Sequence, residues 1–113
     1  MKSILRMPFL LGAICAALAL AAAPPARGDD AIDVQKLLNA KGCLGCHSND
    51  KKIVGPAFHD VATKYAGDAQ AVAKVAASIR NGGVGRWGQV PMPPMGSLSD
   101  AEVAALAAFV LKQ

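Results

Sequence analysis

Apolar residues recur at the spacing of an α-helix in several stretches after residue 28. The first stretch has Asp29 or Asp30 as its candidate N-cap and ends near Gly42, a residue type that favours helix ends. Its apolar side holds Ile32, Val34, Leu37 and Leu38. This pattern predicts an amphipathic helix.

Two more helices are predicted in the middle of the chain. The shorter one covers about Ala57 to Tyr65 and is broken at Gly67. Asp68 opens the longer one, which the Asn81-Gly82-Gly83 sequence stops. The apolar positions of the longer helix are Val72, Val75, Ala76 and Ile79. Residues 42–56, which precede both helices, are expected to form a loop.

A capping box, Ser99-Asp100-Ala101-Glu102, marks the start of a last helix. A loop with four glycines and three prolines, Gly83 to Leu98, leads into it. The apolar side of the helix holds Val103, Leu106, Ala107, Val110 and Leu111. Small residues are expected to let it cross the first helix closely: Ala104, Ala105 and Ala108. Because no segment alternates with the two-residue period of a strand, the sequence predicts an all-α fold.

The first 28 residues have the features of a secretory signal peptide. Lys2 and Arg6 form a basic start, Phe9–Ala23 is an apolar run of 15 residues, and small residues precede a cleavage site before Asp29. This run is shorter than the roughly 20 residues that a membrane-spanning helix needs. We therefore expect a cleaved leader (1–28), a single domain (29–113), a periplasmic location and no stable membrane insertion of the mature form.

The leader also carries most of the net positive charge. The whole chain has a formal net charge of +4, whereas residues 29–113 have 9 basic and 8 acidic side chains. A nearly neutral domain lacks the basic surface that nucleic-acid binding requires, so that class of function is excluded. A domain of about 85 residues has a thin core and often needs a staple, such as a metal or a cofactor.

The Cys43-Leu44-Gly45-Cys46-His47 sequence has the spacing of a c-type haem attachment site. Two thiols separated by two residues can add to the two vinyl groups on one porphyrin edge, and the following imidazole then lies beneath the iron. A thioredoxin-like pair would need a βαβ context, and a zinc site would need more ligands than His59 alone adds. The motif predicts one covalent haem c, with about four short helices wrapped around it.

The loop before the last helix offers a second ligand to the iron. Prolines on both sides of Met92 reduce the entropy that its thioether loses on binding, which makes it a better candidate than Met95. The alternative is that Met92 only fills space in the core. His59 is expected on the surface of the short helix. His47 and Met92 together would leave no open iron position, so the predicted function is one-electron transfer without catalysis.

The sequence resembles the small bacterial class I cytochromes c of the cytochrome c-551 type. The resemblance covers nearly all of residues 29–113. It rests on several short motifs in the same order and spacing: Lys41-Gly42-Cys43, Val54-Gly55-Pro56-Ala57, Asp60-Val61-Ala62, Asn81-Gly82, Trp87-Gly88, Pro91-Met92-Pro93-Pro94 and Ser99-Asp100.

The resemblance implies roles for further residues. Met92 would be the distal iron ligand, the Pro56 carbonyl would accept a hydrogen bond from His47, and Trp87 would donate its indole N–H to a haem propionate. Trp87 could equally be a plain core residue. Similar proteins often have a basic residue near the propionate where this chain has Ser78, and Arg80 is a doubtful substitute. They also often have asparagine at the place of Met95, where its N–H bonds the ligand sulfur.

Three functions remain open from the sequence. The first is a diffusible carrier between respiratory donors and a terminal reductase or oxidase, which would be a monomer that forms transient complexes with redox partner proteins. The second is a dedicated cytochrome subunit of a larger redox enzyme, and the third is a haem peroxidase. Lys41, Lys51 and Lys52 lie near the haem motif, either bordering the haem edge or as ordinary solvated residues.

Overall fold

The computed structural model describes residues 31–113, so the expected leader, 1–28, and the candidate caps Asp29 and Asp30 lie outside the described residues. The elements follow in the order α1 (Val34–Ala40), a short 3₁₀ helix η1 (Cys43–Gly45), α2 (Phe58–Lys64), α3 (Ala71–Asn81) and α4 (Asp100–Val110). Within this part of the chain the only β pairing is an isolated antiparallel bridge between Gly83 and Met92. The predicted all-α class is confirmed.

Helix α1 begins later than predicted. The Asp33 carboxylate accepts a hydrogen bond from the Lys36 backbone N–H at 3.0 Å, which makes Asp33 the N-cap. The expected cap at Asp29 or Asp30 is therefore wrong. A start at Val34 is sufficient to turn Leu37 and Leu38 to the interior, and Ile32 stays outside the helix, 39% exposed.

Helix α3 also begins later than predicted, although its end is correct. Asp68 lies before the helix in a turn, where its carboxylate accepts from the Gln70 N–H at 2.8 Å. The Asp68 carbonyl accepts from the Ala71 N–H at 3.0 Å, and the helix starts only there. At the other end Gly82 has φ 64° and donates its N–H to the Ser78 carbonyl at 2.9 Å, which ends the helix as glycine was expected to do.

The capping box of α4 is confirmed in both directions. The Glu102 N–H donates to Ser99 Oγ at 3.2 Å, and the Ser99 N–H donates to Glu102 Oε2 at 2.7 Å. The prediction for Ala104 is wrong, because this residue is exposed, whereas Ala107 is completely buried. Ala107 shares the inner side of α4 with the other buried residues of the helix, and Ala104 falls on the opposite side.

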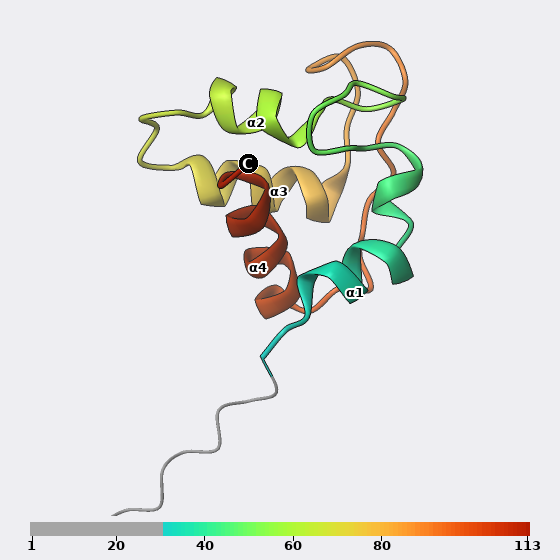
Figure 1. Ribbon diagram of the computed structural model, residues 1–113, viewed down its shortest axis with the longest axis vertical. Helices are drawn as coiled ribbons and strands as arrows, with labels where there is room; N and C mark the ends of the chain where they lie inside the picture. Colours follow the sequence, from blue (N-terminus) through green and yellow to red (C-terminus); the bar gives the residue numbers. More distant parts are fainter. Residues whose placement is uncertain (1–30) are drawn as a thin grey trace, which may run out of the picture.

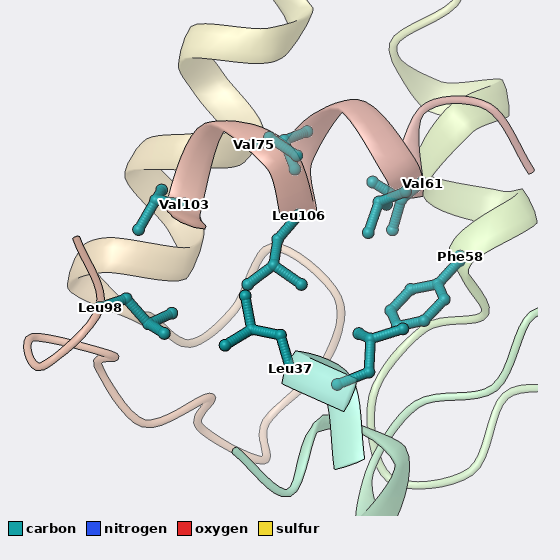
Figure 2. Close-up of a cluster of buried hydrophobic side chains, with 10 residues drawn as sticks. Leu37, Phe58, Val61, Val75, Leu98, Val103 and Leu106 are labelled. Atoms are coloured by element: carbon teal, nitrogen blue, oxygen red, sulfur yellow. The ribbon is translucent and has the colours of Figure 1, made fainter. Parts of the chain in front are cut away.

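Helix α4 is the centre of the packing. It contacts α1, α2 and α3, and Figure 1 shows it crossing α3 while α1 lies beside its N-terminal end. Within residues 31–113 the shared core contains ten buried side chains: Leu37, Leu38, Phe58, Val61, Val75, Leu98, Val103, Leu106, Ala107 and Val110. Figure 2 shows Leu37 and Leu106 pointing toward each other, with the Phe58 ring next to them. This core is small, as expected for the length of the chain.

Two long connections, residues 41–57 and 82–99, lie on the same side of the helices in Figure 1. They contain the predicted haem-attachment and iron-ligand residues Cys43, Cys46, His47 and Met92. No helix within residues 31–113 combines the length and the hydropathy needed to cross a membrane.

Candidate haem site

The two long connections and the inner sides of the helices enclose a cavity of about 550 Å³. Its volume falls in the range of cofactor and small-ligand pockets, roughly 300–1,000 Å³. One wall is formed by core residues of α2, α3 and α4, among them Val61, Val75 and Leu106. The hydrophobic core is thus open on one side, and a flat apolar group in the cavity would complete it.

The attachment motif forms one tight turn at the edge of this cavity. Gly42 has φ 73° and precedes η1, which sequence analysis had expected to be loop, and the His47 N–H donates to the Cys43 carbonyl at 2.9 Å. This turn brings Cys43, Cys46 and His47 to the cavity wall together. The two thiols are not joined in a disulfide. Burial raises the pKa of the half-buried Cys43 thiol, and a backbone N–H at the same residue acts in the opposite direction.

The His47 ring is held on three sides. Its Nδ1 lies 2.8 Å from the buried Pro56 carbonyl oxygen, so Nδ1–H donates and Nε2 keeps its lone pair. The ring stacks on Phe58, with centroids 5.3 Å apart and planes 20° apart. A Cβ on Gly55 would lie 2.4 Å from His47 Cε1, so only glycine fits against this face. Such contacts set the tautomer and the orientation of a ligand imidazole.

Met92 is fixed by its backbone. Its N–H donates to the Gly83 carbonyl at 2.8 Å, and its carbonyl accepts from the Gly83 N–H at 3.0 Å. Gly82 permits this close approach, since a Cβ there would lie 2.2 Å from the Met92 carbonyl oxygen. The half-buried Met92 side chain lines the cavity. The prolines beside Met92 were expected to make its backbone rigid. The two glycines that end α3 provide a second source of this rigidity.

Met95 and His59 differ in their relation to the cavity. Met95 donates its N–H to the Ile79 carbonyl at 3.1 Å, packs against the core and also lines the cavity. His59 is exposed, as predicted, and its Nδ1 lies 3.3 Å from the Gln113 carbonyl. The cavity thus contains two thioethers and one imidazole.

Two adjacent residues with N–H donors, Arg86 and Trp87, line the cavity, and sequence reasoning considered only the tryptophan. Trp87 is half-buried, lines the cavity and has Lys64 Nζ 4.7 Å above its ring centroid. The neighbouring Arg86, which sequence reasoning missed, also lines the cavity and donates to Ser78 Oγ. No local pattern identifies Arg86, because its contact with Ser78 joins a loop to α3.

Arg80 points elsewhere. Its Nη2 lies 2.6 Å from Asp100 Oδ1, and its Nη1 donates to the Leu98 carbonyl. These contacts hold the end of α3 against the start of α4, outside the cavity lining. Among the three lysines near the attachment motif, all of which are exposed, only Lys52 contributes to that lining.

These residues match the chemistry of a covalently attached haem. The two thiols can bind the vinyl groups, the free His47 Nε2 can coordinate iron from one side, and a thioether is available for the other side. Apolar walls suit the porphyrin, and the Arg86 and Trp87 N–H groups suit its carboxylates. When bound, haem supplies an iron that accepts and releases one electron.

Comparison with known proteins supports the same assignment of a haem site. The profile of the Cytochrome c family matches residues 31–113. The chain is 50% identical over 88 residues to cytochrome c-551 of Pseudomonas aeruginosa, which covers 78% of this chain and 84% of the relative. It is 49% identical over 77 residues to cytochrome c-552 of Hydrogenobacter thermophilus, covering 68% and 78%.

A solved structure shows the same arrangement. The crystal structure of Nitrosomonas europaea cytochrome c552 superposes with a TM-score of 0.66 at 42% identity, over 69% of this chain and 96% of that chain. Haem c is therefore the cofactor, and the thioredoxin-like and zinc interpretations of the cysteine pair are excluded. The protein is a small haem electron carrier and not an enzyme. The chain belongs to the cytochrome c family, as a small class I cytochrome c of the cytochrome c-551 type.

Proposed function

We propose that this protein is a periplasmic single-haem electron carrier in which His47 and Met92 are the two axial ligands of the iron. The observation that carries the proposal is the orientation of His47. Its Nδ1 is engaged by the Pro56 carbonyl at 2.8 Å, which leaves Nε2 as the only ring nitrogen free to bind a metal. The hydrogen bond also strengthens electron donation from the ring to a metal.

Met92 is the better of the two thioethers for the opposite side of the iron. Its backbone is held by two hydrogen bonds to Gly83, so the side chain loses little freedom when it binds. Met95 packs against the core cluster, and ligation would have to compete with that packing. A thioether favours ferrous iron and raises the reduction potential.

Two protein ligands on the iron support outer-sphere electron transfer. With both positions filled, substrates such as peroxide find no open site, and little rearrangement accompanies a change of oxidation state. Trp87, which lines the cavity, is proposed to donate its indole N–H to a propionate. This fold and these ligands therefore suit a protein that carries single electrons from respiratory donors to a terminal reductase or oxidase.

The basic start, apolar run and small residues within residues 1–28 support export and cleavage before Asp29. The mature domain, with near-zero net charge and its haem attached, would then act in the periplasm as a monomer. Long-range steering by charge should be modest, and contacts with redox partners should be small and transient. The exposed apolar side chains at the cavity mouth, Ile53, Val54, Val84 and Val90, are suited to such brief contacts.

The optical spectrum of the purified mature protein tests this proposal. Low-spin haem c in both oxidation states, with the weak far-red ferric band of a methionine–iron bond and slow cyanide binding, is expected. A high-spin ferric spectrum with rapid cyanide or carbon monoxide binding would contradict it and favour a peroxidase. Stable co-purification with a large redox enzyme would contradict the diffusible carrier and favour a dedicated subunit.

A further inference from the structure

The charges around the cavity are unevenly distributed. Among the described residues that line it, the cationic side chains are Lys52 and Arg86, and no carboxylate is present. Haem has two propionate carboxylates, on the porphyrin edge opposite the vinyl groups. Lys52 follows Cys46 by six residues in the connection that holds the vinyl edge. Arg86, on the other long connection, is thus the cation available to the propionate edge.

The backbone turn that contains Arg86 directs the Arg86 side chain toward the cavity. Gly85 and Gly88 have φ 91° and 128°, conformations that glycine adopts without strain, and the Gly85 N–H donates to the Gly88 carbonyl at 2.8 Å. Arg86 and Trp87 occupy the turn between these glycines, and both side chains line the cavity. Two N–H donor groups are therefore presented by adjacent residues.

Ser78 on α3 fixes the guanidinium. Its Oγ accepts from Arg86 Nη1 and donates to the Lys74 carbonyl at 3.0 Å. One anchored nitrogen leaves the remaining N–H donors of the guanidinium fork free, and this fork matches a carboxylate. Arg80 is not available for the same task, because Asp100 and the Leu98 carbonyl occupy it.

We propose that Arg86, held by Ser78 and adjacent to Trp87, is the cationic partner of a haem propionate and that its charge raises the reduction potential. This inference rests on the propionate edge lying at Trp87, as in the proposed function. A fixed positive charge near the haem stabilises the ferrous state relative to the more positive ferric state. Since Arg86 is exposed, solvent screens the effect and keeps it moderate.

Equilibration of the holoprotein with a redox dye of known potential tests the proposal. Arg86→Gln removes the charge and keeps a side-chain N–H donor. It is expected to shift the Fe(III)/Fe(II) ratio about threefold toward Fe(III), which is about 28 mV for a one-electron couple. Arg86→Lys keeps the charge and should shift the ratio much less. Arg80→Leu is the matched control and should leave the ratio unchanged.

A charge-relocation variant separates an electrostatic role from a purely structural one. Adding Ser78→Arg to Arg86→Gln places a cation at the same end of the cavity from α3, and most of the lost potential should return. The proposal is overturned if Arg86→Gln changes the ratio no more than Arg80→Leu does. The far-red band reports the axial ligands independently. If the unsubstituted protein lacks this band, the ligation proposed above fails while the Arg86 comparison still stands.

Discussion

Replacing Gly55 with alanine should disturb His47, the proposed iron ligand, more than the same replacement at Gly45 does. The new Cβ would lie 2.4 Å from Cε1, 2.9 Å from Nδ1 and 3.0 Å from Nε2 of His47. Ordinary contact begins near 3.4 Å, so the ring would have to move by about 1 Å. The Nδ1–H···O bond to Pro56, now 2.8 Å long, would then exceed normal hydrogen-bond length.

The expected cost follows from two contributions. Overpacking costs about 1–3 kcal/mol, and loss of the hydrogen bond adds about 0.5–1.5 kcal/mol. The free energy of unfolding should therefore fall by about 1.5–4.5 kcal/mol, which lowers the midpoint of thermal unfolding by roughly 6–36 °C for a domain of this size. The reduction potential should rise, because His47 without its bond to the Pro56 carbonyl is a weaker electron donor and stabilises ferric iron less.

Denaturant unfolding of the holoprotein, followed by the haem absorption, measures this effect. Gly45→Ala is the matched control, since its Cβ would meet no atom within 4 Å and the residue lies in the same segment. The control should retain stability within about 0.5 kcal/mol. The reasoning is refuted if Gly55→Ala is as stable as Gly45→Ala and keeps the same spectrum and potential.

Three further predictions concern other parts of the structure. Gly82→Ala forces a Cβ against the Met92 carbonyl and disfavours φ 64°, so the far-red band should weaken; an unchanged band would contradict this. Met95→Asn supplies an N–H donor near the sulfur of Met92, the proposed ligand, and should raise the potential in a redox titration, whereas an unchanged or lower value would refute it. The contact with Lys74 lowers the pKa of Asp68, so Asp68→Asn should reduce stability at neutral pH. This difference should disappear as the pH falls from the ordinary value of 3.8 through the lower folded-state pKa, and pH-independent denaturation curves would count against it.

The features that sequence reasoning recovered are those encoded by neighbouring residues. The capping box of Ser99 and Glu102 and the stop at Gly82 depend only on local hydrogen bonds and backbone conformation. The start of α1 was missed because several aspartates satisfy the same local rule. The choice of Asp33 depends on which start turns Leu37 and Leu38 toward α4.

The surroundings of the site were less predictable because they depend on contacts between distant segments. Stacking of Phe58 on His47 joins α2 to the attachment turn. Likewise, the sequence left open whether Arg80 pairs with a propionate, whereas its pairing with Asp100 draws it to α4 and leaves Arg86 at the cavity. The local attachment motif that begins at Cys43 identifies the cofactor. Contacts between distant segments, by contrast, determine which cationic side chains line the cavity.

Methionine ligation is the central claim, and two matched variants test it most directly. Met92 and Met95 both line the cavity, so Met92→Ala and Met95→Ala each remove one thioether from it. The far-red ferric band should disappear in Met92→Ala, with conversion to a state that binds cyanide readily, and should persist in Met95→Ala. A band that survives in Met92→Ala but is lost in Met95→Ala would contradict the proposed ligation.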